Sequence, residues 1–184
     1  TYTVIGAAPC VNGSSTVTVT INAPPTAGSD GAISVCEIDA AFNLFSQLGG
    51  AAQAGGSWTF AGAAHGSTFT PGTDAPGAYT YTVPGTAPCP ADIATVTVTV
   101  NAMPDAGIDG GLTLCSSSPA TSLITGLNGT PDAGGTWTAP GGGASNGTFT
   151  PGVSATGIYT YTVNGTAPCP AVSATVDVNV VTNP

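Results

Sequence analysis

The segments Tyr79-Thr-Tyr-Thr-Val83 and Thr95-Val-Thr-Val-Thr-Val100 decide the fold of this chain. In both, large apolar residues alternate with threonine. Because successive side chains of a strand point to opposite faces, each segment has one apolar face and one hydroxyl face. Between them lies Gly85-Thr-Ala-Pro-Cys-Pro-Ala91, whose glycine and prolines are typical of a turn. The pattern predicts two strands that cover a core on one side and meet water on the other.

This pattern recurs along the chain. Tyr159-Thr-Tyr-Thr-Val163 and Gly165-Thr-Ala-Pro-Cys-Pro-Ala171 repeat it closely, and Thr1-Tyr-Thr-Val4 begins an earlier, partial copy. A regular repeat of this kind indicates an array of similar units. We therefore divide the chain into residues 1–22, the C-terminal part of a preceding repeat, and two full repeats at 23–101 and 102–184. We also expect the chain to be a processed piece of a longer array, since it has no initiator methionine and no signal peptide.

Each full repeat carries six or seven short segments with strand character, separated by Gly, Pro or Asn-Gly turns. An antiparallel β-sandwich of about 80 residues fits this pattern, and no helix longer than one turn is expected. The core should contain the inward Val, Tyr, Phe and Leu rows together with Trp58 or Trp137. Besides the two alternating segments, the strand candidates are Ile33–Cys36, Phe42–Phe45, Ser57–Phe60, Thr68–Thr70 and Val176–Val180.

The charge composition excludes several function classes. The 184 residues include no Lys or Arg, nine Asp or Glu and one His, for a net charge of −9. Without cations the chain cannot neutralise nucleic-acid phosphates, build a P-loop or bind an anionic membrane surface. No apolar run reaches the roughly 20 residues that span a bilayer. We expect no nucleic-acid partner and no membrane span.

The cysteines predict disulfide bonds. Each full repeat has two cysteines at similar spacing, which favours intra-repeat bonds Cys36–Cys89 and Cys115–Cys169. Cys10 is then an orphan whose partner would precede residue 1. Paired cysteines are typical of an oxidising, extracellular compartment.

No residue set suggests catalysis. His65 is the only histidine and has no equivalent in the second repeat, so we interpret it as a loop residue without a role. Glu37 and Asp39 could be imagined as the carboxylate pair of a glycosidase, but the second repeat has serines there. We interpret them as exposed loop acids, and we expect no enzymatic activity and no cofactor.

The segment Asn101–Gly110 joins the two full repeats. Asp30 and Asp109 recur before glycine, which is first of all a turn signal. Asp105 and Asp109 are also oxygen ligands of the type that calcium binds, so they form a possible metal site. We expect a stiff linker that does not require calcium, with Met103 and Ile108 packing between the repeats.

Four Asn-Gly-Ser/Thr segments admit two interpretations. They match the acceptor pattern for N-glycosylation, and Asn-Gly is also a leading tight-turn dipeptide. The turn is the preferred interpretation if the chain is bacterial, and glycosylation is preferred if it is a secreted eukaryotic chain. The segments begin at Asn12, Asn128, Asn146 and Asn164.

The motifs together resemble the immunoglobulin-like repeats of giant cell-surface proteins of Bacteroidetes. That group includes gliding-motility-associated adhesins exported by the type nine secretion system. The resemblance rests on Ala27-Gly28, Asp30-Gly31, Cys36, Trp58, Tyr79-Thr-Tyr-Thr-Val83, Cys89-Pro90 and their second-repeat counterparts.

The resemblance implies tandem immunoglobulin-like sandwiches that form the stalk or fibre of an extracellular adhesin at the cell surface. The implied partners are neighbouring repeats of the same longer chain and other copies in a filament. The alternative is a carbohydrate-binding or accessory module of a secreted hydrolase. In that case exposed Trp58 and Trp137 would stack on sugar rings.

Overall fold

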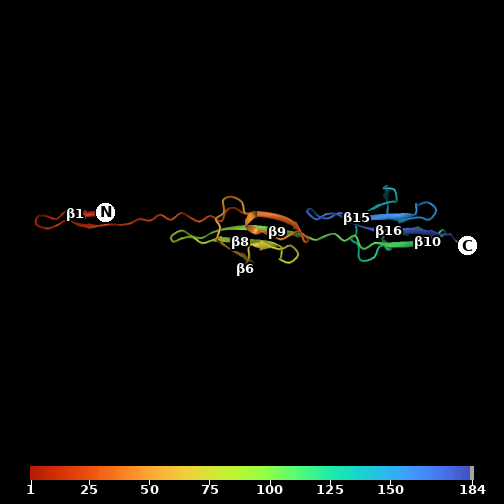
Figure 1. The fold of residues 1–184 in the computed structure, drawn as a ribbon, viewed down its shortest axis with the longest axis horizontal. Coiled ribbons are helices and arrows are strands. Elements are labelled where there is room, and N and C mark those ends of the chain that lie inside the picture. The colour runs from red at the N-terminus through yellow and green to blue at the C-terminus, as the bar shows by residue number, and fades with distance from the viewer. Residues whose placement is uncertain (183–184) are drawn as a thin grey trace.

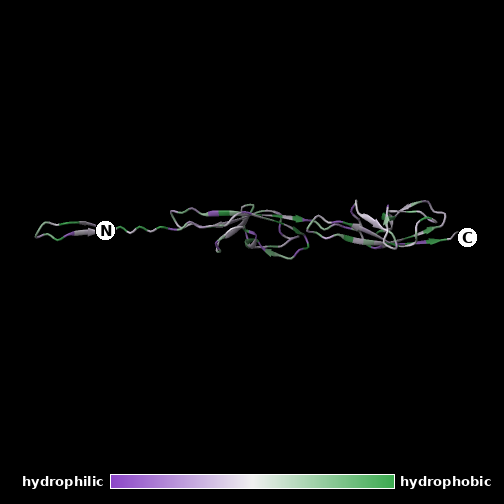
Figure 2. Cartoon of the chain, turned by 90° about the horizontal axis from the view of Figure 1, so that it is seen from above, coloured by the Kyte–Doolittle hydropathy of each residue, from purple (hydrophilic) through white to green (hydrophobic). Residues whose placement is uncertain are grey.

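The computed structural model describes residues 1–182 and shows an elongated molecule (Figure 1). A short N-terminal hairpin is followed by two similar β-folded units placed end to end. Figure 2, a view turned by 90°, shows the same extended arrangement, with hydrophobic and hydrophilic stretches interspersed along the chain. The strands are β1 (Tyr2–Val4), β2 (Gly13–Ser15), β3 (Gly31–Cys36), β4 (Phe42–Asn43), β5 (Ser57–Phe60), β6 (Ala63–His65), β7 (Thr68–Phe69), β8 (Gly77–Val83), β9 (Asp92–Asn101), β10 (Gly110–Cys115), β11 (Thr121–Ser122), β12 (Thr136–Thr138), β13 (Ala144–Ser145), β14 (Thr148–Phe149), β15 (Gly157–Val163) and β16 (Val172–Val181).

Both units are sandwiches with the same topology. In the first, a five-stranded sheet in the order β3-β9-β8-β5-β6 faces the two-stranded sheet β4-β7. In the second, the order is β10-β16-β15-β12-β13, with β11-β14 as the small sheet. Short 3-10 helices, η1 (Leu44–Gln47) and η2 (Leu123–Gly126), follow β4 and β11. The predicted all-β, immunoglobulin-like sandwich is confirmed as the fold class.

One pair of strands in each large sheet is parallel. Strand β3 runs parallel to β9, with Gly31 opposite Val96 and Cys36 opposite Asn101, and β10 runs parallel to β16 in the same way. The predicted antiparallel arrangement holds for the other strand pairs of these sheets but not for this edge pair. The physical reason is that β3 enters from the linker and runs along the long axis in the same direction as β9, the strand that leaves the unit.

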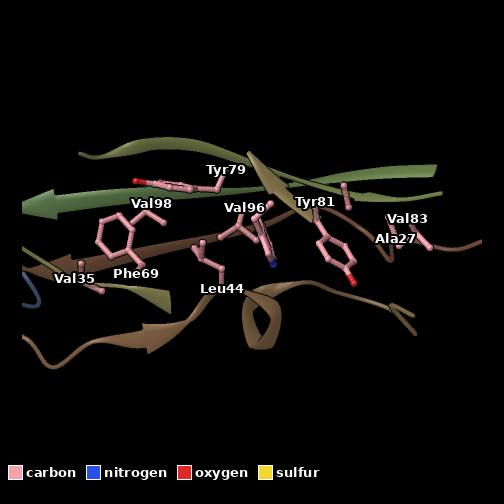
Figure 3. Packing of buried hydrophobic residues seen from close by; sticks show 11 residues of the cluster. Ala27, Val35, Leu44, Phe69, Tyr79, Tyr81, Val83, Val96 and Val98 are labelled. Carbon is pink, nitrogen blue, oxygen red and sulfur yellow. The ribbon is translucent and has the colours of Figure 1, made fainter. Parts of the chain in front are cut away.

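The core lies on the apolar face of the alternating strands, as predicted. In the first unit Tyr79, Val96 and Val98 point between the two sheets toward Phe69 and Leu44 (Figure 3). Both tryptophans are buried, with exposed fractions of 5% for Trp58 and 9% for Trp137. Their expected place in the core is therefore confirmed.

Two tyrosines of β8 organise this core. The Tyr79 hydroxyl donates to Ala75 O at 2.6 Å, the tyrosine corner typical of immunoglobulin-like sandwiches. Two residues later, where antibody domains carry a core cysteine, stands Tyr81. Its ring packs on Trp58 at 4.9 Å between centroids, and its hydroxyl donates to Gln53 O and accepts from Gly56 N. An aromatic pair thus replaces the internal disulfide of antibody domains.

The second unit repeats both devices. Tyr159 donates to Ala155 O at 2.7 Å, and Tyr161 packs on Trp137 at 4.9 Å. This recurrence shows that the sequence repeat is also a repeat of core packing.

Three local details differ from the sequence-based expectations. The segment Phe42–Phe45 is a strand only through Asn43, because the Asn43 side chain accepts from Phe45 N and starts η1. Strands β6 and β13 were not predicted, since their short Ala- and Ser-containing segments lack apolar alternation. His65 lies in β6 rather than in a loop, paired with Trp58.

The N-terminal segment forms a hairpin in which β1 pairs with β2. By sequence it corresponds to the end of β8, the following loop and β9, but its apolar residues are exposed: Tyr2 72%, Val4 55%, Val17 79%, Val19 79% and Ile21 91%. The predicted boundaries at 22/23 and 101/102 stay a prediction. The sheets of the two units run over Gly31–Asn101 and Gly110–Val181, and residues 183–184 lie outside the described part.

We predict that alkaline pH destabilises both units through the tyrosine corners. Burial, and then the Asp74 carboxylate, raise the pKa of Tyr79 above 10.0, and burial raises that of Tyr159. The unfolded state therefore loses these protons first, so stability present below pH 10 is lost as the pH rises through the folded pKa. Thermal melting followed by circular dichroism from pH 7 to 12 should show this decline.

The matched variant is Tyr79→Phe with Tyr159→Phe. At neutral pH it should cost about 1 kcal/mol per site, the usual net worth of one hydrogen bond. Its stability should fall less steeply above pH 10 than that of the parent chain. An equally steep fall in both proteins would show that the corner hydroxyls do not carry the effect.

Candidate functional site: the junction between the repeats

The contact between the two units is made by a loop of the second unit that extends toward the first. Residues 164–171 connect β15 to β16 and extend from the second unit toward the first (Figure 1). The corresponding loop of the first unit, residues 84–91, extends toward the N-terminal hairpin in the same direction. We call residues 164–171 the docking loop, because its tip contacts the preceding unit.

The docking loop has a compact tip. Cys169 N donates to Thr166 O at 2.9 Å, and the Ala167–Pro168 peptide bond is cis. Gly165 is required here, since a Cβ at this position would lie 2.5 Å from Cys169 O and 2.7 Å from Pro170 O. The same turn occurs in the loop of the first unit, where Cys89 N donates to Thr86 O at 2.9 Å.

The receiving surface is the end of the parallel pair β3-β9. Asn101 at this end donates from its side-chain amide to Ala167 O of the docking loop at 2.7 Å. Cys169 Sγ also lies 3.2 Å from Asn101 O. Directly opposite Asn101 in the sheet stands Cys36, so the tip of the loop meets the last residues of both strands.

A disulfide bond between Cys36 and Cys169 closes this contact. Their Cα atoms are 4.9 Å apart, and the exposed fractions of the two residues are 0% and 5%. The bond joins successive units across a sequence separation of 133 residues. Cys10, Cys89 and Cys115 are free.

The predicted pairs Cys36–Cys89 and Cys115–Cys169 were therefore wrong. Within one unit the two cysteines lie at opposite ends of the sandwich, because Cys36 ends β3 while Cys89 precedes β9, which runs parallel to it. The ten residues of β9 separate them by about 33 Å at roughly 3.3 Å per residue. A disulfide requires Cα atoms within about 7 Å.

Two acidic side chains accept hydrogen bonds from backbone amides at the receiving surface. Glu37 Oε1 accepts from Met103 N of the linker at 3.0 Å, and Asp39 Oδ2 accepts from Cys36 N at 2.7 Å. Both residues are exposed, as predicted, but both hold backbone at the junction. The linker itself departs from its prediction, because Ile108 is 66% exposed and does not pack between the units.

The candidate metal ligands hold backbone in two separate places. Asp105 Oδ1 accepts from Gly107 N at 2.7 Å, whereas Asp109 Oδ1 accepts from Thr175 N at 2.7 Å. Asp30 does the same as Asp109 in the first unit, toward Thr95 N. The recurring aspartate thus tethers the entry to each sandwich to strand β9 or β16. Within residues 1–182 no group of three or more His, Cys, Asp or Glu is placed to hold a metal ion.

His65 contacts an aspartate, Asp74, that the second unit lacks, and a tyrosine, Tyr79, that has an equivalent there. Its Nε2 lies 3.6 Å from Asp74 Oδ1, and its ring meets Tyr79 edge-on at 4.8 Å between centroids. The second unit has Ser154 in place of Asp74, and Ser154 Oγ accepts from Thr150 N as Asp74 does from Thr70 N. The turn that follows β7 or β14 therefore forms in both units, although only the first unit has the histidine.

Three of the Asn-Gly segments use their asparagine side chains within the fold. Asn12 accepts from Gly6 N, Asn128 donates to Asp109 O, and Asn146 accepts from Thr148 N. These contacts fit the turn interpretation.

Comparison with known proteins supports the fold assignment. No family model and no curated protein matches the chain. Among solved structures, the three-domain I67–I69 fragment of titin from the I-band aligns with 12% identity and a TM-score of 0.54, and its E-to-A mutated variant with 11% and 0.52. Each alignment covers 84% of this chain and 64% of the titin fragment, so the chain spans less than two thirds of their length. The similarity is to tandem immunoglobulin domains, and at this identity it concerns the fold.

We predict that replacement of Cys36 affects stability and that replacement of the equivalent Cys115 does not. Cys36→Ser should release the Cys169 thiol and lower the melting temperature, since closure of a loop of 133 residues is worth about 5 kcal/mol in the chain-entropy treatment. Cys115→Ser, the matched control in the second repeat, should leave both the Cys36–Cys169 bond and the melting temperature unchanged. Non-reducing peptide mapping after pepsin digestion measures the pairing, as the chain has no trypsin site. Release of Cys169 by Cys115→Ser would restore the intra-repeat scheme.

Proposed function

We propose that this chain is a segment of the stalk or fibre of a secreted bacterial cell-surface adhesin. The observation that carries the proposal is the docked loop with its Cys36–Cys169 bond, because it joins two immunoglobulin-like units end to end by a covalent bond as well as by the linker. Such a junction limits bending between units. An element that holds a binding domain away from a surface needs this property.

The remaining support comes from composition. A disulfide fits an oxidising, extracellular compartment. The threonine-rich surface keeps the chain hydrated with only 5% charged residues, and the absence of Lys and Arg removes trypsin-like cleavage sites. The described residues include no helix long and apolar enough to cross a membrane. The assignment to Bacteroidetes adhesins and the type nine secretion system rests on the sequence resemblance alone.

The alternative carbohydrate-binding module requires exposed aromatic residues. Trp58 and Trp137 are packed against Tyr81 and Tyr161 in the cores, so they offer no platform for a sugar ring. A shallow hollow of about 220 Å³ is lined by the aromatic residues Phe45, Trp58 and Tyr81 together with small and polar residues such as Asn43 and Ser67, but Trp58 and Tyr81 expose only 5% and 2% of their surface there. We therefore favour the structural role, and we include in the proposal that the fragment has no catalytic activity.

We further propose that the junction does not depend on calcium. The Asp105 and Asp109 carboxylates each accept from a backbone amide, and calcium takes six to eight oxygen ligands. Stiffness then comes from the docking loop, through the Asn101–Ala167 hydrogen bond and the disulfide.

Small-angle X-ray scattering tests the stalk model. The oxidised chain should give an elongated profile that does not change with a calcium chelator. The double variant Cys36→Ser, Asn101→Ala should give a profile with greater flexibility and shorter mean extension, because the disulfide and the Asn101–Ala167 hydrogen bond are then both lost. Cys115→Ser with Asn179→Ala, which alters no junction contact, is the matched control.

Two results would contradict the proposal. A loss of extension on chelation that Asp109→Ala abolishes would show that calcium sets the stiffness. An oxidised parent chain as flexible as the double variant would show that the docking loop does not stiffen the junction.

A further inference from the structure

We propose that Cys89 and Cys115 are each one half of a further inter-repeat disulfide of the same type as Cys36–Cys169. Cys115 would bond the docking-loop cysteine of a following repeat in the same polypeptide. Cys89 would bond the cysteine that ends the first strand of a preceding repeat. Every junction of the array would then be closed by one such bond.

The first argument is that Cys89 occupies the same place as Cys169. Its loop has the same turn, and Asn22 donates to Ala87 O at 2.8 Å as Asn101 donates to Ala167 O. The Cys89 thiol lies 3.4 Å from Asn22 O, matching the contact of Cys169 with Asn101 O. The loop is therefore already docked on Asn22, which corresponds in sequence to Asn101 at the end of β9.

The second argument is that Cys115 occupies the same place as Cys36. Each ends the first strand of its unit, beside the C-terminal end of the parallel strand, at Val181 and Asn101 respectively. Cys115 N donates to Ser118 Oγ at 3.0 Å, as Cys36 N donates to Asp39. Cys115 is exposed, whereas the bonded Cys36 is fully buried, so a docking loop placed here would bury it.

The third argument excludes a bond inside one unit. Cys115 ends β10 while Cys169 precedes the parallel strand β16, so the length of that strand separates them, as in the first unit. Within one tandem array, the partner must then come from a neighbouring repeat. Val181 replaces Asn101 at this end and has no side-chain amide to donate to the loop, so this junction depends more on its disulfide.

Formation of each bond is an ordinary thiol–disulfide exchange. Two cysteine thiols lose two protons and two electrons to form the S–S bond, and the disulfide of a small-molecule or protein oxidant is reduced to two thiols. The loops closed by successive bonds overlap, because Cys115 lies inside the loop from Cys36 to Cys169. In such an array each covalent loop overlaps in sequence with the next.

A longer chain tests the inference directly. Residues 26–184 are appended in phase after Pro184 of the full chain, which places a docking loop after Cys115, and the protein is oxidised with glutathione disulfide. Non-reducing peptide mapping should join Cys115 to Cys89 of the appended segment, with Cys36–Cys169 present in both copies. The control variant Cys89→Ser in the appended segment should leave Cys115 as a free thiol.

Two outcomes would overturn the inference. One is a free Cys115 in a chain whose Cys36–Cys169 bonds have formed. The other is pairing of Cys115 between separate molecules, seen as disulfide-linked dimers that disappear on dilution before oxidation. This test is separate from that of the stalk function, because the scattering experiment measures stiffness at a junction whose bond is already formed.

Discussion

The structure depends on one constraint, namely that β3 and β9 are parallel neighbours. The constraint places the two cysteines of a repeat at opposite ends of a sandwich about 33 Å long. The cysteine that ends β3 can then meet only the docking loop of the next unit. Bond formation at the junction, the direction of the docking loop and the end-to-end arrangement all follow from this placement.

The use of cysteine at the junction leaves the core without a disulfide. Tyr81 stands where antibody domains have a core cysteine, and its packing against Trp58 with two hydrogen bonds stabilises the interior instead. The division is the same in the second unit, with Tyr161 and Trp137. Aromatic packing therefore stabilises each unit, while the disulfide joins one unit to the next.

The sequence was sufficient to predict the fold class, the strands with apolar–threonine alternation and the burial of both tryptophans. Periodicity carries this information because it reports which face of a strand is buried. It does not report strand direction, so the parallel edge was missed, and with it the pairing of Cys36. Equal spacing of cysteines in successive repeats fits bonds within a repeat and bonds between repeats alike. The position of Cys36 at the end of one strand and of Cys89 before another was the available signal.

Single-molecule stretching of the full chain between its termini tests the central claim most directly. With the Cys36–Cys169 bond intact, the segment from Cys36 to Cys169, a sequence separation of 133, cannot extend. The fully stretched oxidised chain should therefore be shorter than the reduced chain by about 450 Å, at roughly 3.4 Å per residue. Equal stretched lengths in the two states, or a difference made up of two separate shorter loops, would contradict a covalent junction between the repeats.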